Sequence, residues 1–317
     1  MNSNLVAMLE HKYFKSSKEI SMTINNCEVR YIESDSNAII MIQGDYHKSV
    51  DLFFNIDTLF FICFGTYPVI KNLKYNGENI ANILNKFSSD HQFDFQPALS
   101  ADPVSLINQN TIDLLKSVNS TPLYALEYVV SEAYSKVITN HRLTLLLHII
   151  DGFLQFTYEE IKNNRDKLKR TYKKNSNSTY LVKVYYICEK YIFPYLPNCK
   201  LLEVLNIKEF DFMETITSTR NWGSHLYEVE GEDKVLFKGK DIIIYFYILY
   251  FALRLFMCEK IGLKFKNEDV IGYYNLIHDY ILWLGNPNNH NIEDYKSVNY
   301  KIKCFISEMQ KLSNSEK

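Results

Sequence analysis

The chain has 317 residues, 47% of them apolar and 23% charged, and its formal net charge is −2. This length exceeds what one domain usually needs and fits two. The near-neutral charge excludes a chain-wide positive field for nucleic acid, so any contact with RNA or DNA must come from a local basic patch. The 24 tyrosines and 20 phenylalanines predict a core packed largely with aromatic rings.

The six cysteines lie far apart, without the C-x-x-C pairs or nearby histidines of a structural zinc site. The first residues lack the apolar stretch of a secretory signal. The longest apolar run, residues 242–253, is shorter than the roughly 20 residues of a membrane span. We therefore expect a cytoplasmic protein with reduced thiols and no membrane contact.

The N-terminal part favours strands. The runs EISMTI, CEVRYIE, AIIMIQ and YPVIKNLKY are short and rich in β-branched or aromatic residues, and NN, SDSN and GDYHKS separate them. The run VDLFFNIDTLFFICF fits a helix or a buried strand equally well. Residues 78–120 suggest short helical pieces and polar loops. We expect an α+β domain over residues 1–118, with a sensor or regulatory role as one interpretation.

From residue 119 onward the pattern is helical. A helix starts at Thr121 and Pro122, a hydroxyl cap followed by proline at the first helical position, and apolar residues then repeat at spacings of three and four. Helices are predicted over residues 121–137, 140–154, 179–195, 241–262, 268–284 and 295–312, with shorter pieces at 201–207 and 208–220. The predicted fold class is an α+β N-terminal unit followed by an all-α helical bundle over 119–317, the last part being a C-terminal helical extension.

Residues 217–228 read TSTRNWGSHLYE, with Arg220 and His225 five positions apart. The threonines before Arg220 weaken helix propensity, and Gly223 and Ser224 favour a bend. This composition predicts that a helix ends near Arg220, so that its guanidinium and the imidazole of His225 point into one cleft.

A similar spacing at Arg142 and His148 serves as a comparison. The residues between them are LTLLL, inside a strong helical pattern. There a partly buried or interface arginine and a structural histidine are the better interpretation. His278, within YYNLIHDYILWL, is also expected to be structural.

The segment RNWGSH resembles the R-N-x-x-x-H form of the motif found in HEPN domains, helical bundles many of which are metal-independent RNases of defence and toxin–antitoxin systems. The later segment KGKDIIIYFYILYFALRLFMCEKIGL resembles the long helix after the motif in the ApeA-like HEPN family of anti-phage abortive-infection proteins. The resemblance covers roughly residues 121–263. It implies a homodimeric endoribonuclease toxin with Arg220, Asn221 and His225 as catalytic residues, an RNA substrate such as tRNA, and control by a phage trigger or an antitoxin.

RNA cleavage through the 2′-hydroxyl needs a base, an acid and positive charge on the phosphorane. His225, with an ordinary pKa of about 6.5, can transfer the protons, and Arg220 can hold the phosphate through two N–H groups while Asn221 orients it. One imidazole cannot be acid and base at once, so a twofold dimer would supply the second. Helix 242–257 could bury part of that interface; it could also be the central helix of the bundle, and the two interpretations do not exclude each other.

RNA also needs a path to the cleft. Residues 162–174, KNNRDKLKRTYKK, are predicted either to bind the RNA backbone, with Tyr172 stacking on a base, or to form a solvated charged loop. The candidate contacts are Lys167, Lys169, Arg170, Lys173 and Lys174. Tyr227 and Glu228 either line the site or belong to a surface loop.

The sequence shows no tight cluster of metal-binding carboxylates and no GxxxxGK[ST] or GxGxxG loop, so we expect no metal and no cofactor. The alternative to the nuclease is a non-catalytic HEPN-like module that binds a partner protein or a nucleotide, with Arg220 and His225 in contact or structural roles.

Overall fold

The structure, a computed structural model, describes residues 4–10, 14, 18–34, 36–65, 67–80, 103–118, 122–123, 125–126, 140–198, 201, 207–225 and 241–285. The chain divides into two compact units. The first comprises residues 1–120, 130–135 and 257–265, and the second comprises 121–129, 136–256 and 266–317. The domain boundary between residues 118 and 119 stays a prediction.

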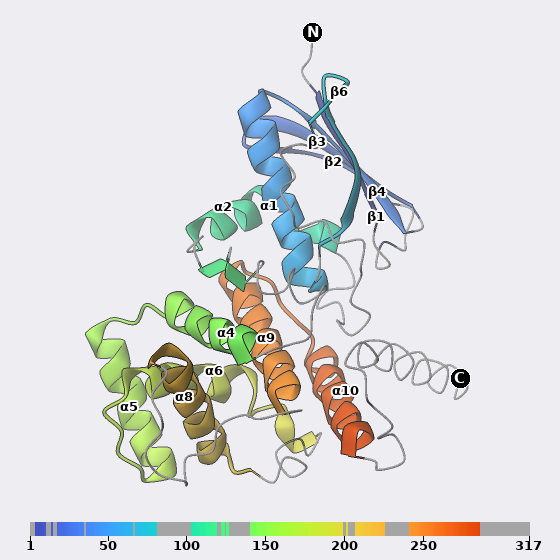
Figure 1. Cartoon of the computed structure of the whole chain (residues 1–317). Coiled ribbons are helices and arrows are strands. Elements are labelled where there is room, and N and C mark those ends of the chain that lie inside the picture. The colour runs from blue at the N-terminus through green and yellow to red at the C-terminus, as the bar shows by residue number, and fades with distance from the viewer. Residues whose placement is uncertain are drawn as a thin grey trace. The chain divides into compact units, whose positions relative to one another are not determined.

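The first unit contains a six-stranded antiparallel sheet in the order β2-β3-β4-β1-β5-β6 (Figure 1). Its strands are β1 (Asn4–Glu10), β2 (Lys18–Ile24), β3 (Cys27–Ser34), β4 (Asn37–Gln43), β5 (Val69–Tyr75) and β6 (Glu78–Asn79). The four predicted strands are confirmed as β2 to β5. Asn25 and Asn26 both have positive φ, as do Asn76 and Gly77, which matches the tight hairpin turns that asparagine and glycine favour.

Strand β1 was not predicted, although it pairs with β4 on one side and β5 on the other. Its signal is present in the sequence: Leu5, Ala7 and Leu9 alternate with more exposed residues and are fully buried. Such alternation is typical of a strand with one face on the core. The N-terminal residues therefore lie in the middle of the sheet.

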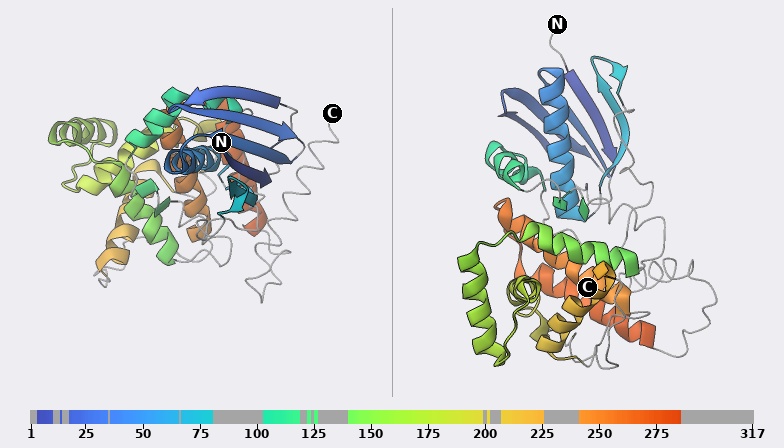
Figure 2. Two further views of the ribbon diagram at one scale, coloured as in Figure 1. Left: turned by 90° about the horizontal axis from the view of Figure 1, so that it is seen from above. Right: turned by 60° about the vertical axis from the view of Figure 1, so that its left-hand side comes forward.

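The ambiguous run forms helix α1 (Tyr46–Phe64), which covers one face of the sheet (Figure 2). The helix starts inside GDYHKS, which we had assigned to a break, because the Asp45 side chain accepts hydrogen bonds from the backbone N–H groups of His47 (3.0 Å) and Lys48 (3.4 Å). Gly65, at φ 77°, ends it. Phe14 packs edge-on against Phe60, with ring centroids 5.5 Å apart, in the core between helix and sheet.

The remaining described elements are helical. They are η2 (Pro103–Leu106), α2 (Gln109–Ser117), α4 (Asn140–Phe153), α5 (Tyr158–Tyr172), α6 (Thr179–Tyr191), η3 (Leu196–Asn198), α8 (Glu209–His225), α9 (Asp241–Lys260) and α10 (Asn267–Gly285). The fold class is confirmed: an α+β N-terminal unit is followed by a largely helical region. Of the helix predicted over 121–137, residues 122, 123, 125 and 126 are described and helical. The helix predicted over 295–312 lies outside the described residues.

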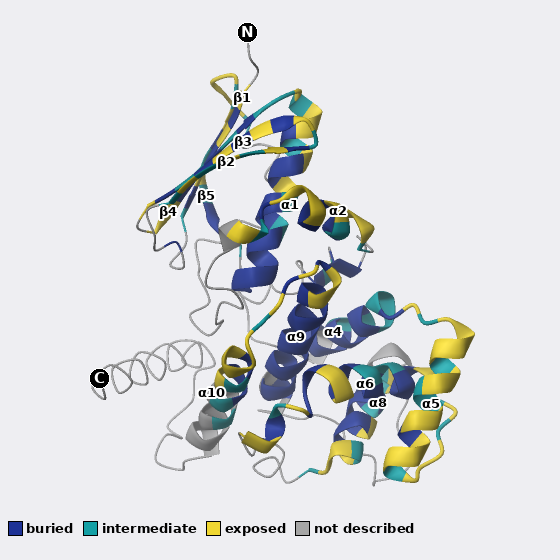
Figure 3. Ribbon diagram, turned by 180° about the vertical axis from the view of Figure 1, so that it is seen from behind, coloured by how far each residue is buried: buried dark blue, intermediate teal, exposed yellow. Residues whose placement is uncertain are grey.

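Helix α9 is the central helix of the second unit. Its rings meet α4 through Phe256 and Phe153 (centroids 5.7 Å apart), α8 through Tyr245 and Phe212, and α10 through Phe251 and a tyrosine stacked on it at 3.7 Å. Nearly all its described residues are buried within this one chain (Figure 3). This burial favours the central-helix interpretation, and the described part of α9 has no broad exposed face for a dimer interface.

Candidate active site on helix α8

Helix α8 runs without interruption through the Arg220–His225 segment. The predicted bend at Gly223 and Ser224 is therefore wrong. Glycine costs a helix about 1 kcal/mol relative to alanine, which is less than packing can supply, and α8 packs against both α4 and α6.

The threonines before Arg220 also failed to end the helix. The Thr215 hydroxyl donates to the Asp211 carbonyl at 2.7 Å, and the Thr217 hydroxyl donates to the Met213 carbonyl at 2.9 Å. These bonds satisfy the hydroxyls inside the helix, one turn back along the chain. Both side chains are buried, so tertiary packing outweighs their low propensity.

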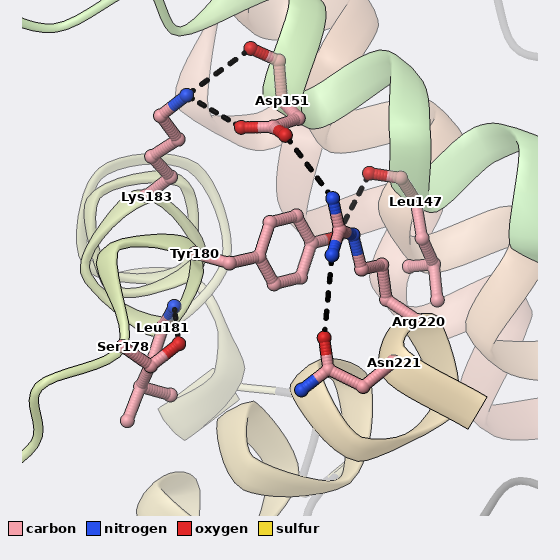
Figure 4. Close-up of polar contacts among 8 residues, drawn as sticks. All are labelled: Leu147, Asp151, Ser178, Tyr180, Leu181, Lys183, Arg220 and Asn221. Carbon is pink, nitrogen blue, oxygen red and sulfur yellow. Dashed lines mark hydrogen bonds and ion pairs between the residues drawn. The ribbon is translucent and has the colours of Figure 1, made fainter. Parts of the chain in front are cut away.

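Arg220 is held from three sides (Figure 4). Its Nη2 lies 3.3 Å from Asp151 Oδ2, and its Nη1 donates to Asn221 Oδ1 at 3.3 Å. Its Cζ lies 5.0 Å from the centre of the Tyr180 ring, a cation–π contact. The side chain of Arg220 is 21% exposed, so the guanidinium is oriented by the protein and still reaches the surface.

Tyr180 and Lys183, on α6, complete the cluster. Lys183 Nζ contacts Asp151 Oδ1 and also donates to the Asp151 carbonyl at 3.3 Å. The Tyr180 hydroxyl donates to the Leu147 carbonyl at 2.8 Å. Burial raises the pKa of Tyr180 well above its ordinary value, while nearby Arg220 lowers it in part. The phenol therefore stays neutral and acts as a fixed platform under the guanidinium.

Sequence reasoning missed Asp151, Tyr180 and Lys183, because they lie 69, 40 and 37 positions from Arg220. One signal was available: Asp151 is an acidic residue directly after the apolar run LTLLLHII. A charge at the end of such a run often has a specific partner.

The structure brings Arg220 and Asn221 into direct contact and places His225 on the same helix. Asn221 is exposed. Asn221 and His225 are four residues apart, so their Cα atoms lie on the same side of α8, one turn from each other. Tyr227 and Glu228 lie outside the described residues.

The comparison pair on α4 behaves as a structural pair. Arg142 is 4% exposed and His148 is partly buried. Both have interactions within the chain. Burial of Arg142 is thus confirmed.

The basic segment is not a loop. Residues 158–172 form α5, which begins with a capping box: Glu160 N–H donates to the Thr157 hydroxyl, and Thr157 N–H donates to the Glu160 carboxylate. The loop interpretation is wrong because this cap and the buried Leu168 stabilise a helix.

Three of the candidate RNA contacts lie in the second half of α5, Lys173 is its C-cap, and Lys174 follows it. All five are exposed and none forms an ion pair with a described carboxylate; they are Lys167, Lys169, Arg170, Lys173 and Lys174. Tyr172 faces the protein instead. Its hydroxyl donates to Glu209 Oε2 at 2.8 Å, and burial followed by this bond raises its pKa. The predicted stacking of Tyr172 on a base conflicts with this placement.

Among the described residues, no group of three or more His, Cys, Asp or Glu side chains is arranged to hold a metal ion. Within the same ranges, no helix is long and apolar enough to span a membrane. Comparison of the chain with known proteins found no matching family model, no similar curated protein and no similar solved structure. The resemblance to HEPN domains therefore stays a prediction.

Proposed function

We propose that this protein is a metal-independent endoribonuclease of HEPN type, with its active site on helix α8. The observation that carries the proposal is the anchored Arg220: a partly exposed guanidinium, oriented by Asp151, Asn221 and Tyr180, on the same helix as His225. Such preorganisation is what stabilisation of a developing phosphorane requires.

Arg220 would bind the non-bridging oxygens of the scissile phosphate. A guanidinium stays charged at every working pH and offers parallel N–H groups to two oxygens. Asp151, on α4, would be a positioning residue because it contacts the guanidinium directly, and Lys183, on α6, would act through its contact with Asp151.

His225 would carry the proton transfers. The 2′-oxygen attacks phosphorus as its proton passes to a base, and the bond from phosphorus to the 5′-oxygen breaks as that oxygen accepts a proton from an acid. The products are a 2′,3′-cyclic phosphate and a 5′-hydroxyl. A homodimer would provide two copies of His225, one for each role, and its interface would use surfaces other than the buried α9.

The RNA backbone would lie along the exposed basic face of α5. These lysines and Arg170 have no described carboxylate partner, so their charge is available to phosphates, although Lys174 Nζ already lies 5.7 Å from the centre of the Phe210 ring. The face supplies a local positive patch of the kind that a chain of near-neutral net charge needs to bind RNA. The cellular setting we propose is a cytoplasmic anti-phage toxin that cuts an RNA such as tRNA and is released by a phage trigger or restrained by an antitoxin. No cofactor enters this chemistry.

The test is incubation of total RNA with wild type, His225→Ala and His47→Ala proteins in excess EDTA, followed by mapping of product ends. Loss of general acid–base catalysis lowers the rate about 100-fold or more. We expect His225→Ala to lose cleavage, while His47→Ala, which removes an exposed imidazole from α1, retains it. Equal cleavage by wild type and His225→Ala would refute this site.

A non-catalytic binding module is the second candidate, and one observation favours it. Arg220 is already paired with Asp151 and seated on Tyr180, an arrangement that also suits a structural arginine. This alternative predicts that wild type binds RNA or a nucleotide and leaves every phosphodiester bond intact.

A further inference from the structure

A concavity of about 430 Å³ lies on the sheet of the first unit. Apart from Met22 on β2 and Val29 on β3, its described lining residues are those that alternate with the more buried residues of their strands, so it opens on the face away from α1. Pockets of about 300 to 1,000 Å³ are typical of sites for small molecules. Nothing in the proposed nuclease chemistry uses this region.

One row of its lining is polar. The strand register places Thr23 opposite Glu28, Glu28 opposite Gln43, and Gln43 opposite Asn4. Neighbours in such a row are about 4.5 to 5.5 Å apart. None of these four side chains has a hydrogen-bond partner in the described part of the chain. A hydroxyl, a carboxylate and two amides thus face the concavity side by side.

The adjacent row of lining residues contains two apolar side chains, Met41 and Val6. Ser21 lies opposite Arg30, Arg30 opposite Met41, and Met41 opposite Val6. Val6 is 38% exposed, a large value for an apolar residue in the middle of a sheet, and Met41 is partly buried. Apolar side chains gathered at an open concavity, with polar groups at the rim, are typical of a ligand site.

The charges select against anions. Arg30 is the only cation among the described residues of the lining, and Glu19 binds it: Nε donates to Glu19 Oε1 at 2.7 Å, and Nη2 contacts the same oxygen. Glu28 has no described cationic partner. The site therefore offers an acceptor-only carboxylate to a ligand that donates N–H groups, and it repels phosphate.

We infer that this concavity binds one uncharged guanine base, as the nucleoside. Guanine has adjacent ring and amino N–H groups that a single carboxylate, Glu28, can accept together, and its neighbouring carbonyl can accept from the Gln43 amide. Met41 and Val6 would pack under the ring. Because the lining has no aromatic side chain, a stacked single strand is not the expected ligand.

The test is calorimetric titration of the full chain with guanosine, adenosine, cytidine, uridine and guanosine monophosphate. Guanosine should bind tightest, and the monophosphate should bind more weakly than guanosine. Glu28→Gln replaces one acceptor oxygen by a donor and should weaken guanosine binding about 10-fold or more, since hydrogen bonds to charged groups are the stronger ones.

The matched control is Glu10→Gln, which changes an exposed carboxylate of the same sheet that pairs with Lys71 outside the concavity; it should bind guanosine as wild type does. Three results would each overturn the inference: no binding of guanosine, equal binding by Glu28→Gln and wild type, or tighter binding of the monophosphate. RNA cleavage by His225→Ala and wild type is a separate measurement, so this inference and the nuclease proposal can fail independently.

Discussion

Asp151 holds two cations, Arg220 through one carboxylate oxygen and Lys183 through the other. Its side chain is 38% exposed, whereas that of Lys183 is 11% exposed. Removal of the carboxylate would leave two neighbouring positive charges without their shared counter-ion.

We predict that Asp151→Ala lowers the free energy of unfolding by about 1 to 2 kcal/mol, between the effects of exposed and buried ion pairs. Urea unfolding would measure this change. If the chain cleaves RNA, kcat should also fall, because the guanidinium loses its orientation, and KM should change less. The control is Asp51→Ala, which breaks an exposed pair with Lys116 and should cost under about 1 kcal/mol. Equal effects of the two substitutions would contradict the positioning role.

At the scale of single residues, the sequence predicts little of the candidate site beyond the segment from Arg220 to His225. Arg220, Asn221 and His225 lie within six consecutive positions, so a local pattern can indicate them. The partners of Arg220 come from two other helices, and only tertiary packing brings them together.

Helix α5 shows why the element scale is harder than it looks. Most residues of α5 are polar and only Leu168 is fully buried. Its sequence therefore shows little of the apolar periodicity that indicates a helix. The capping box at Thr157 and Glu160 was the better signal, because it marks a helix start regardless of how polar the following residues are. For helix α8 the prediction was wrong in the opposite sense. Glycine and threonine suggested that the helix ends near Arg220, but tertiary packing keeps it helical to His225.

We predict that the double substitution Lys169→Ala and Lys173→Ala weakens RNA binding uniformly across sequences. Both residues are exposed: Lys169 lies in the last turn of α5, and Lys173 is the C-cap that directly follows the helix. Each lost contact to a single-stranded phosphate lowers the slope of log K against log salt by about 0.7, so the slope should fall by about 1.4. Titration of a labelled RNA at several salt concentrations measures it.

The control for the α5 experiment is Lys264→Ala with Lys266→Ala, which removes the same charge from exposed positions outside α5. It should leave the slope near that of wild type. An equal loss in both double variants would mean that net charge, and not the α5 face, determines RNA affinity.

The whole molecule is rich in buried tyrosine, as its composition predicted. Burial raises the pKa of Tyr180 and of Tyr273 well above the ordinary value. The folded state thus keeps these phenol protons, whereas the unfolded chain releases them at about pH 10. The stabilisation is fully present below about pH 10 and is lost as the pH rises above it.

We predict that Tyr180→Phe lowers the free energy of unfolding by about 1 kcal/mol at pH 8, because the bond to the Leu147 carbonyl is lost. Above about pH 10 the difference in unfolding free energy between the two proteins should narrow. The wild type loses stability as the Tyr180 phenol is deprotonated in its unfolded state, and the variant has no such phenol. Urea unfolding between pH 8 and 11 measures both effects. The control is Tyr158→Phe, which changes a side chain that is 76% exposed and should be as stable as wild type at pH 8. If the difference in unfolding free energy between Tyr180→Phe and wild type stayed constant with pH, deprotonation of this phenol would not be its cause.

At the scale of the chain, the order of strands followed by helices was predictable from periodicity, and the fold class followed from that order. The sheet topology was not, because strand order depends on pairings between residues far apart in sequence. Strand β1 makes this plain: it precedes every other strand and lies between β4 and β5.

That central position of β1 has a consequence for synthesis on the ribosome. Strand β1 leaves the exit tunnel before β5, its second neighbour, which follows some 60 positions later. The hairpin of β2 and β3 can form early, but the sheet cannot be completed until residues 69–75 have emerged, so β1 keeps one unpaired edge until then. Deletion of residues 4–10 would leave β4 and β5 without the strand that joins them.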